Sequence, residues 1–202
     1  WKVNRLNWTS NHYAELTRKL ATAEQPELII YPETALPLYF NDAFYAPYTD
    51  PIIALAPELD IPILLGSLHG DVQNRQAPTY NRAFLIDTSG EVVDFADKVH
   101  LVPFGEFLPF PWIFQYLEGL TAESGTFTHG DQHKALDLPD SDISFGVFIC
   151  YESIFPEITR ALMQHNPDFL VNTTNDAWFG TTAAPHQHWA QVVLRAVESG
   201  RA

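Results

Sequence analysis

The stretch ISFGVFICYESIFPEITRALMQHNPDFLVNTT, residues 143–174, contains the alternation of element types that decides the fold. Its first part, 143–152, is an apolar run rich in β-branched and aromatic residues, which predicts a buried strand. A helix is predicted over 155–166, because Pro156 suits a helix start and apolar residues then recur at helical spacing. Residues 168–174 predict a second strand. A strand, a helix and a strand in succession indicate a layered α/β domain.

The rest of the chain repeats this alternation. Helical spacing predicts a helix over 12–25, with Ser10 or Asn11 as its cap and an apolar face of Tyr13, Leu16 and Leu20. Apolar runs predict further strands at 27–31, 61–69 and 133–139, a hairpin of 79–87 with 91–98 whose turn is at 88–90, and a last helix over 186–200. We therefore expect one α/β domain over residues 1–202.

Composition excludes several classes of protein. The chain has 202 residues, of which 46% are apolar, and its formal net charge is −14, so a partner bound through phosphate groups, such as nucleic acid, is not expected. One cysteine cannot form an internal disulfide. No apolar run reaches the roughly 18 to 20 residues that span a bilayer. The chain begins without Met and stops within a helical pattern, and we interpret it as a fragment.

Three reactive side chains follow apolar runs, at the points where predicted strands end. Cys150, the only cysteine, closes one run, and Glu33 and Lys98 follow two others. In α/β proteins the carboxyl ends of strands border the crevice that binds ligands, so we expect these side chains to meet there. Each also fits a structural alternative: a buried thiol, a solvated loop carboxylate and a surface lysine.

Together the three residues form a complete set for acyl transfer. A carboxylate takes the proton of the thiol, the thiolate attacks a carbonyl carbon, and an ammonium group stabilises the oxyanion. Histidine is the competing partner for a catalytic cysteine, and the candidates are His69, His100, His186 and His188. None of them stands in a recognisable cysteine-protease motif. The pair His186 and His188 is only a weak indication of a metal site, because a third ligand at recognisable spacing is lacking. We expect no metal and no organic cofactor.

Four motifs in order carry a family resemblance: YPETALP (31–37), DKVHLVPFGEFLPF (97–110), FGVFICYESIFPE (145–157) and NTTNDAWFG (172–180). They resemble the nitrilase superfamily of carbon–nitrogen hydrolases, and within it the apolipoprotein N-acyltransferase branch. The resemblance implies a four-layer α-β-β-α sandwich, incomplete at both termini. It assigns the superfamily's triad to Glu33 as general base, Lys98 as oxyanion stabiliser and Cys150 as acylated nucleophile, and the branch adds Glu106 in the PFGE segment.

The resemblance implies further site residues. Tyr151 and Glu152 match a Tyr-Glu pair of the branch, whereas soluble amidases of the superfamily typically have Tyr-Asp and an Arg here. Trp178 matches a loop near the active site and is a candidate acyl-chain contact, and Trp8 resembles a functional tryptophan near the start of the domain. The aromatic segment 102–114 would either touch lipid chains or pack against the protein.

The function implied is transfer of an acyl chain from a phospholipid, phosphatidylethanolamine, to the amine of a diacylglyceryl-cysteine at the start of a lipoprotein. The resemblance also implies a bacterial inner-membrane protein whose spanning helices lie outside this chain and whose domain faces the periplasm. Two alternatives stay open: a soluble amidase that releases ammonia, and a catalytically silent binding domain. The intact set of Glu33, Lys98 and Cys150 argues against the silent domain.

Overall fold

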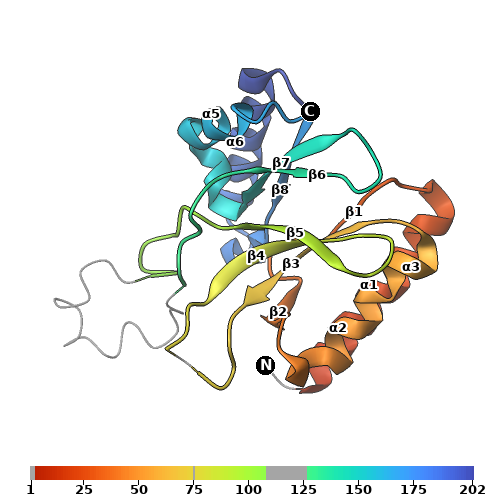
Figure 1. Cartoon of the computed structure of the whole chain (residues 1–202). Helices are drawn as coiled ribbons and strands as arrows, with labels where there is room; N and C mark the ends of the chain where they lie inside the picture. Colours follow the sequence, from red (N-terminus) through yellow and green to blue (C-terminus); the bar gives the residue numbers. More distant parts are fainter. Residues whose placement is uncertain (1–2, 75, 108–126) are drawn as a thin grey trace, which may run out of the picture.

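The computed structural model describes residues 3–74, 76–107 and 127–202, and in this part of the chain two β-sheets lie one above the other (Figure 1). The larger sheet has the order β1-β3-β4-β5, with β2 also paired to β3. Its strands are β1 (Ile29–Ile30), β2 (Leu36–Tyr39), β3 (Ile63–His69), β4 (Tyr80–Ile86) and β5 (Val92–Asp97). The smaller sheet consists of β6 (Ala135–Asp137), β7 (Ser144–Ile149) and β8 (Phe169–Thr173).

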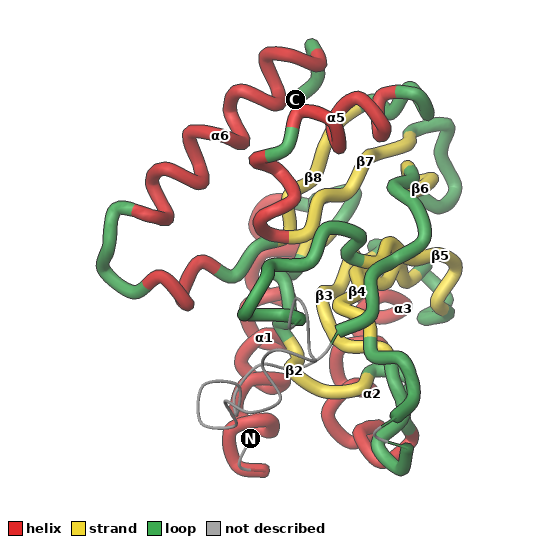
Figure 2. Tube along the Cα trace, turned by 90° about the vertical axis from the view of Figure 1, so that its left-hand side faces the viewer, coloured by secondary structure: helices red, strands yellow, loops and turns green. Residues whose placement is uncertain are grey.

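Helices cover the outer faces of both sheets. Helices α1 (Val3–Glu24), α2 (Ala46–Ile53) and α3 (Leu55–Leu59) belong to the larger sheet, and α5 (Pro156–Met163) and α6 (Ala184–Ser199) to the smaller one. Figure 2 shows α5 and α6 at the end of the molecule that carries β7 and β8, and α1 and α2 at the opposite end. Short 3-10 turns are η1 (Ala43–Tyr45), η2 (Cys150–Ile154) and η3 (Asp176–Phe179).

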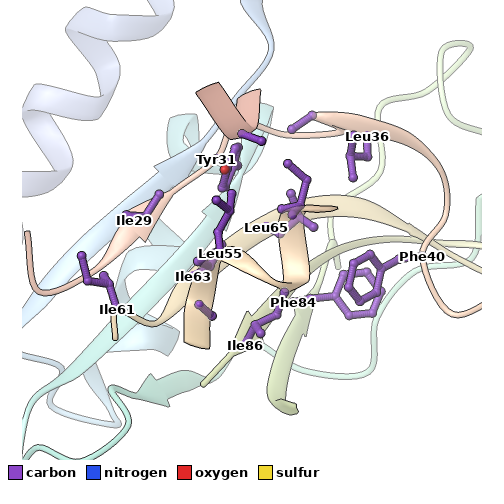
Figure 3. Packing of buried hydrophobic residues seen from close by; sticks show 14 of the residues in the cluster. Ile29, Tyr31, Leu36, Phe40, Leu55, Ile61, Ile63, Leu65, Phe84 and Ile86 are labelled. Atoms are coloured by element: carbon purple, nitrogen blue, oxygen red, sulfur yellow. The ribbon is translucent and has the colours of Figure 1, made fainter. Parts of the chain in front are cut away.

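Residues along each central strand alternate between two cores, because successive side chains of a strand point to opposite faces. On β3, Ile63 and Leu65 lie in one cluster with residues of the helices α1 to α3, among them Leu55 (Figure 3). Leu64 lies in the cluster between the sheets. On β7, Ile149 lies between the sheets and Phe148 lies in a third cluster with residues of α5. Three apolar clusters between four layers confirm the predicted α-β-β-α sandwich.

Strand pairing carries the candidate site residues to one region. Strand β3 runs parallel to β1 and antiparallel to β4, and β4 pairs antiparallel with β5 in the predicted hairpin, so Lys98 follows β5 directly. Strands β7 and β8 are parallel, as expected for a strand–helix–strand unit. The helix predicted to end at Gly200 does so, with Gly200 in the left-handed conformation at φ 64°.

The first helix differs from its prediction. It begins at Val3 rather than near residue 12, and Ser10 is no cap: it is buried inside the helix and its hydroxyl donates to the Tyr48 carbonyl at 2.7 Å. The apolar face was also predicted wrongly, because Leu16 and Leu20 are each 46% exposed. The buried positions are Leu6, Ser10, Ala14, Thr17 and Ala21, and the small side chains among them allow close packing.

The strand and the helices between residues 36 and 59 were not predicted from the sequence. Helix α2 contains Pro47 in its first turn and Pro51 inside it, and α3 contains Pro57, so the prolines hid two short helices that tertiary packing forms. The aromatic segment predicted at 102–114 lies, from residue 108 onward, outside the described residues. In the described part of the chain no helix is both long and apolar enough to cross a bilayer.

Candidate active site

The structure brings Glu33, Lys98 and Cys150 together from three strand ends. Glu33 follows β1 after two residues, Lys98 follows β5, and Cys150 opens η2 directly after β7. The Lys98 ammonium lies 3.2 Å from Glu33 Oε1, and the Cys150 thiol hydrogen-bonds to the Glu33 side chain. The cluster therefore contains a thiol beside a carboxylate that is paired with an ammonium group.

Lys98 is a buried cation held between two carboxylates. It is 1% exposed, and its Nζ also lies 2.6 Å from Glu106 Oε1. Burial by itself lowers the pKa of Lys98, but the charges of Glu33, Glu106 and Cys150 and the hydrogen bond to Glu106 outweigh it, so the pKa is raised. A permanent positive charge therefore stands beside the thiol.

Glu33 is fixed by its neighbours on the larger sheet. Its side chain is buried, and Oε1 accepts a hydrogen bond from Asn81 Nδ2 at 2.7 Å in addition to the contact with Lys98. Gly66 on β3 lies directly against the Glu33 turn: a Cβ added to it would lie 2.2 Å from the Pro32 carbonyl oxygen and 2.8 Å from the Glu33 Cα. Only glycine therefore permits the backbone of Glu33 to pack this closely. No pattern in the sequence indicated that Gly66 positions Glu33.

Gly66→Ala is expected to lower turnover by about 10²-fold, because the added methyl group pushes the Glu33 turn outward and displacements of about 1 Å at a reacting group cost that much. Steady-state turnover of the full-length protein measures the effect. Gly105→Ala is the matched control, since a Cβ there lies 3.6 Å from its nearest neighbour, an ordinary contact. Equal turnover of the two variants would contradict the role given to Gly66.

Cys150 occupies a strained backbone position. Its φ is 56°, in the left-handed region that costs a non-glycine residue on the order of 1–3 kcal/mol. The pKa of the Cys150 thiol is raised to about 11, chiefly by burial and also by the Glu33 charge, although Lys98 and Thr174 lower it. The resting residue is thus a neutral thiol that needs a base before it can attack.

Alkylation of Cys150 by iodoacetamide is expected to be slow at pH 7 and to accelerate about tenfold per pH unit up to pH 10, because only the thiolate reacts and its pKa is about 11. Mass-spectrometric quantification of the alkylated Cys150 peptide, with free N-acetylcysteine in the same tube as reference, measures this profile. A rate that levels off between pH 8 and 9 would show an ordinary thiol and refute the expectation.

Glu106 closes the loop that follows Lys98. Its Oε2 accepts from the Val102 backbone N–H at 2.8 Å, and its own N–H donates to the Val102 carbonyl at 2.8 Å. The side chain is 14% exposed, and its other carboxylate oxygen, Oε1, contacts Lys98. The arrangement holds one carboxylate oxygen of Glu106 on the Lys98 ammonium group, and a catalytic role for Glu106 stays a prediction.

Glu152 ties the nucleophile turn to the Lys98 loop. Its buried carboxylate accepts from the backbone N–H groups of Val99 and His100 through Oε1, and from that of Ile149 through Oε2. Burial raises the pKa of Glu152 to about 7, although these N–H groups and Lys98 lower it. These contacts make Glu152 a brace between the segments that carry Lys98 and Cys150, and a catalytic role for it stays a prediction.

The described ring contact of Tyr151 is with Phe155 and not with a residue of this cluster. The ring is 37% exposed and packs edge-on against Phe155, with 5.6 Å between centroids. A direct role for its hydroxyl stays a prediction.

Trp8 and Trp178 line one pocket together with Glu33. The pocket has a volume of about 750 Å³, and its wall comes from α1, the Pro32–Pro37 segment, and the loop at 175–178. Trp8 is 65% and Trp178 is 82% exposed, and Tyr13 and Leu16 add apolar surface. The structure thus places both predicted tryptophans and Glu33 on the wall of one pocket, with Trp8 on α1 and Trp178 in η3.

The histidines separate into different environments. His186 is exposed, whereas His188 is buried and its Nε2 lies 3.0 Å from the Cys150 carbonyl oxygen rather than serving as partner of the thiol. The His100 ring packs on Phe155, and His69 lies among aromatic rings. Among the described residues no group of three or more His, Cys, Asp or Glu side chains could hold a metal ion.

Two features define the class of protein. One is a thiol beside the ion-paired side chains of Glu33, Lys98 and Glu106, and the other is the four-layer sandwich. The carbon-nitrogen hydrolase family model matches residues 4–201, and the chain belongs to this family. Within it the chain is 40% identical over 187 residues to the apolipoprotein N-acyltransferase of Geobacter metallireducens, covering 93% of this chain and 35% of that protein. The protein of the same name from Rhizobium rhizogenes is 38% identical over 184 residues, which cover 88% of this chain and 33% of the relative.

The chain spans about a third of the length of these curated relatives. Among solved structures, a carbon-nitrogen hydrolase from Helicobacter pylori superposes with a TM-score of 0.68 at 16% identity, covering 97% of this chain and 66% of the other. A glutamine-dependent NAD+ synthetase from Acinetobacter baumannii matches with a TM-score of 0.58 at 19% identity, over 84% of this chain and 30% of that one. At these identities the structural likeness concerns the fold.

Proposed function

We propose that this chain is the catalytic part of an enzyme that transfers an acyl chain from a phospholipid to the N-terminal amine of a diacylglyceryl-cysteine, through a thioester on Cys150. The observation that carries the proposal is the position of the chain's one thiol beside the buried Glu33–Lys98 pair, which the partly buried Glu106 extends. The names of its relatives, apolipoprotein N-acyltransferases, supply the substrate class.

Acylation begins with transfer of the thiol proton to Glu33. The Cys150 sulfur forms a bond to the ester carbonyl carbon, and the negative charge that develops on the carbonyl oxygen is stabilised by the Lys98 ammonium group. The carbon–oxygen ester bond then breaks, and the leaving alkoxide of the lysophospholipid takes the proton from Glu33. The products of this half-reaction are the thioester and a neutral lysophospholipid hydroxyl.

Deacylation uses the same groups in reverse order. The free amine attacks the thioester carbonyl, Glu33 accepts a proton from the nitrogen, and the carbon–sulfur bond breaks. The proton returns from Glu33 to the sulfur, so that the enzyme ends as it began and the new amide is released. Glu106 keeps Lys98 charged and oriented through both halves of the cycle.

An acyl-chain substrate suits the surroundings of Glu33 better than a small polar amide does. The pocket beside Glu33 is large and mainly apolar, and exposed indole rings of Trp8 and Trp178 border it. Aromatic residues with an apolar body and a polar edge are favoured where protein meets lipid. We assign these two tryptophans to contacts with the acyl chain of the donor.

The whole protein is proposed to be anchored in the bacterial inner membrane by segments outside this chain, with the domain on the periplasmic side. Lipid donor and lipoprotein acceptor both reside in membranes, so an active site beside the bilayer shortens the path of each substrate. The strongly acidic chain, with a formal net charge of −14, would require such an anchor because it is weakly repelled by anionic lipid surfaces.

The test is transfer activity of the full-length protein, in vesicles that contain phosphatidylethanolamine and a synthetic diacylglyceryl-cysteine peptide. A peptide mass increase by one acyl chain, together with lysophospholipid release in equal amount, is the expected result. Ammonia release from small amides, without any acylated peptide, would reject the acyltransferase and favour the amidase, and neither product would favour the silent domain.

A further inference from the structure

A second polar cluster contacts the backbone carbonyl of Cys150, apart from the contacts that Lys98 and Glu33 make with each other. Its centre is His188 of α6, which is 7% exposed. His188 Nδ1 lies 2.9 Å from Asp176 Oδ1, and Nε2 lies 2.9 Å from Ser153 Oγ and 3.0 Å from the Cys150 carbonyl oxygen. Three separate elements, η2, η3 and α6, therefore meet at one imidazole ring.

The polar partners of His188 lie at both ring nitrogens. Nδ1 faces the Asp176 carboxylate, and Nε2 faces both the Cys150 carbonyl oxygen and the Ser153 hydroxyl. Ser153 Oγ in turn donates to the Cys150 carbonyl at 3.1 Å and accepts from Asn172 Nδ2 at 3.1 Å. His188 and Ser153 thus connect the Cys150 carbonyl to Asp176 and to Asn172.

The same carboxylate oxygen also reaches the thiol end of Cys150. Thr174 Oγ1 donates to Asp176 Oδ1 at 2.9 Å, and the Thr174 side chain lies beside the Cys150 thiol, whose pKa it lowers. Asp176 is therefore linked to the carbonyl of Cys150 through His188 and to its sulfur through Thr174. This network spans the residue whose φ of 56° would otherwise relax toward the ordinary region.

We propose that His188 and Asp176 are positioning residues that hold the backbone carbonyl and the thiol of Cys150 in the conformation from which the sulfur attacks. They act through Cys150 and touch no substrate. The inference rests on the proposed function only in taking Cys150 as the nucleophile. The sequence already placed His188 among the candidate histidines, but as a base for the cysteine or as a metal ligand and not as a positioning residue.

The test compares His188→Phe with His186→Phe in the full-length protein. Phenylalanine keeps the ring volume and removes both ring nitrogens, and His186 is an exposed histidine two residues earlier on the same helix. His188→Phe is expected to lower kcat about 10²-fold with KM for the phospholipid within twofold, because the nucleophile and not the pocket is disturbed. His186→Phe is expected to match the wild type.

A second readout needs no substrate and so separates this inference from the proposed function. The pH profile of Cys150 alkylation reports the surroundings of the sulfur, and the charged groups that face it, Glu33 and Lys98, are unchanged in both variants. In His188→Phe the titration midpoint is expected to move at least one unit toward that of an ordinary thiol, in a single kinetic phase. A wild-type profile in His188→Phe would overturn the inference.

Asp176→Asn covers the case in which His188→Phe does not fold. It keeps the shape of the side chain and removes the charge that pairs with His188. A loss of kcat of about tenfold, and no further loss when His188→Gln is added to it, is expected for residues that act as one unit. Additive losses, or unchanged kcat in Asp176→Asn, would overturn the positioning pair.

Discussion

Cys150→Ala is expected to abolish acyl transfer, with turnover lowered by at least about 10³-fold, because the alanine side chain cannot form the covalent intermediate. The substitution should leave the fold intact. Cys150 is small, and its side-chain hydrogen bonds reach Glu33 and Thr174, which keep other partners in Asn81, Lys98 and Asp176. Turnover in vesicles and thermal unfolding of the same preparation measure both parts of the prediction.

Cys150→Ser is the matched control for this experiment. Its hydroxyl preserves hydrogen bonding to Thr174 but is a far weaker nucleophile than a thiol, so a large loss in the serine variant as well attributes the effect to the sulfur. Turnover above a tenth of the wild-type value in Cys150→Ala would remove the thiol from the mechanism.

Lys98→Met is expected to have the second-largest effect, on activity and on stability together. Loss of the oxyanion-stabilising charge costs about 10²- to 10³-fold in turnover. Glu33 is left buried without its cation, and the partly buried Glu106 loses the same partner; removing one partner of a buried pair costs about 3–5 kcal/mol of unfolding free energy. Turnover and chemical denaturation of the full-length protein measure the two effects.

Lys134→Met provides the control for Lys98→Met. Lys134 pairs with Asp94, and both side chains are partly exposed, so removal of this pair is expected to cost no more than about 1 kcal/mol and no activity. If Lys98→Met loses as little as Lys134→Met, the buried Lys98 charge is not needed for the fold or the chemistry.

The layers of the fold could be predicted because they depend on local patterns. Apolar runs at 61–69 and 143–149 are strands whose alternate residues fill two cores, and the strand ends indicated where Glu33, Lys98 and Cys150 would meet. The buried face of α1 could not be predicted from hydrophobicity. Its positions are largely small or polar residues such as Ser10 and Thr17, which are selected by close packing and not by apolar area.

Parts of the site were also beyond prediction, since they depend on contacts between distant segments. Gly66 matters because the Glu33 turn crosses β3 there, which no local pattern records. The resemblance implied a catalytic role for Glu152, which stays a prediction, but not the three backbone N–H groups that its carboxylate binds. His188 acquires its partners only when α6 folds back over η2.

The most direct measurement is the intact mass of the full-length protein after incubation with phosphatidylethanolamine vesicles, without acceptor. We predict a mass gain of one acyl chain that hydroxylamine removes, that maps to the Cys150 peptide and that is absent from Cys150→Ala. A wild-type protein that forms no such adduct while it transfers acyl chains to the peptide, or an adduct that persists in Cys150→Ala, would contradict the thioester mechanism.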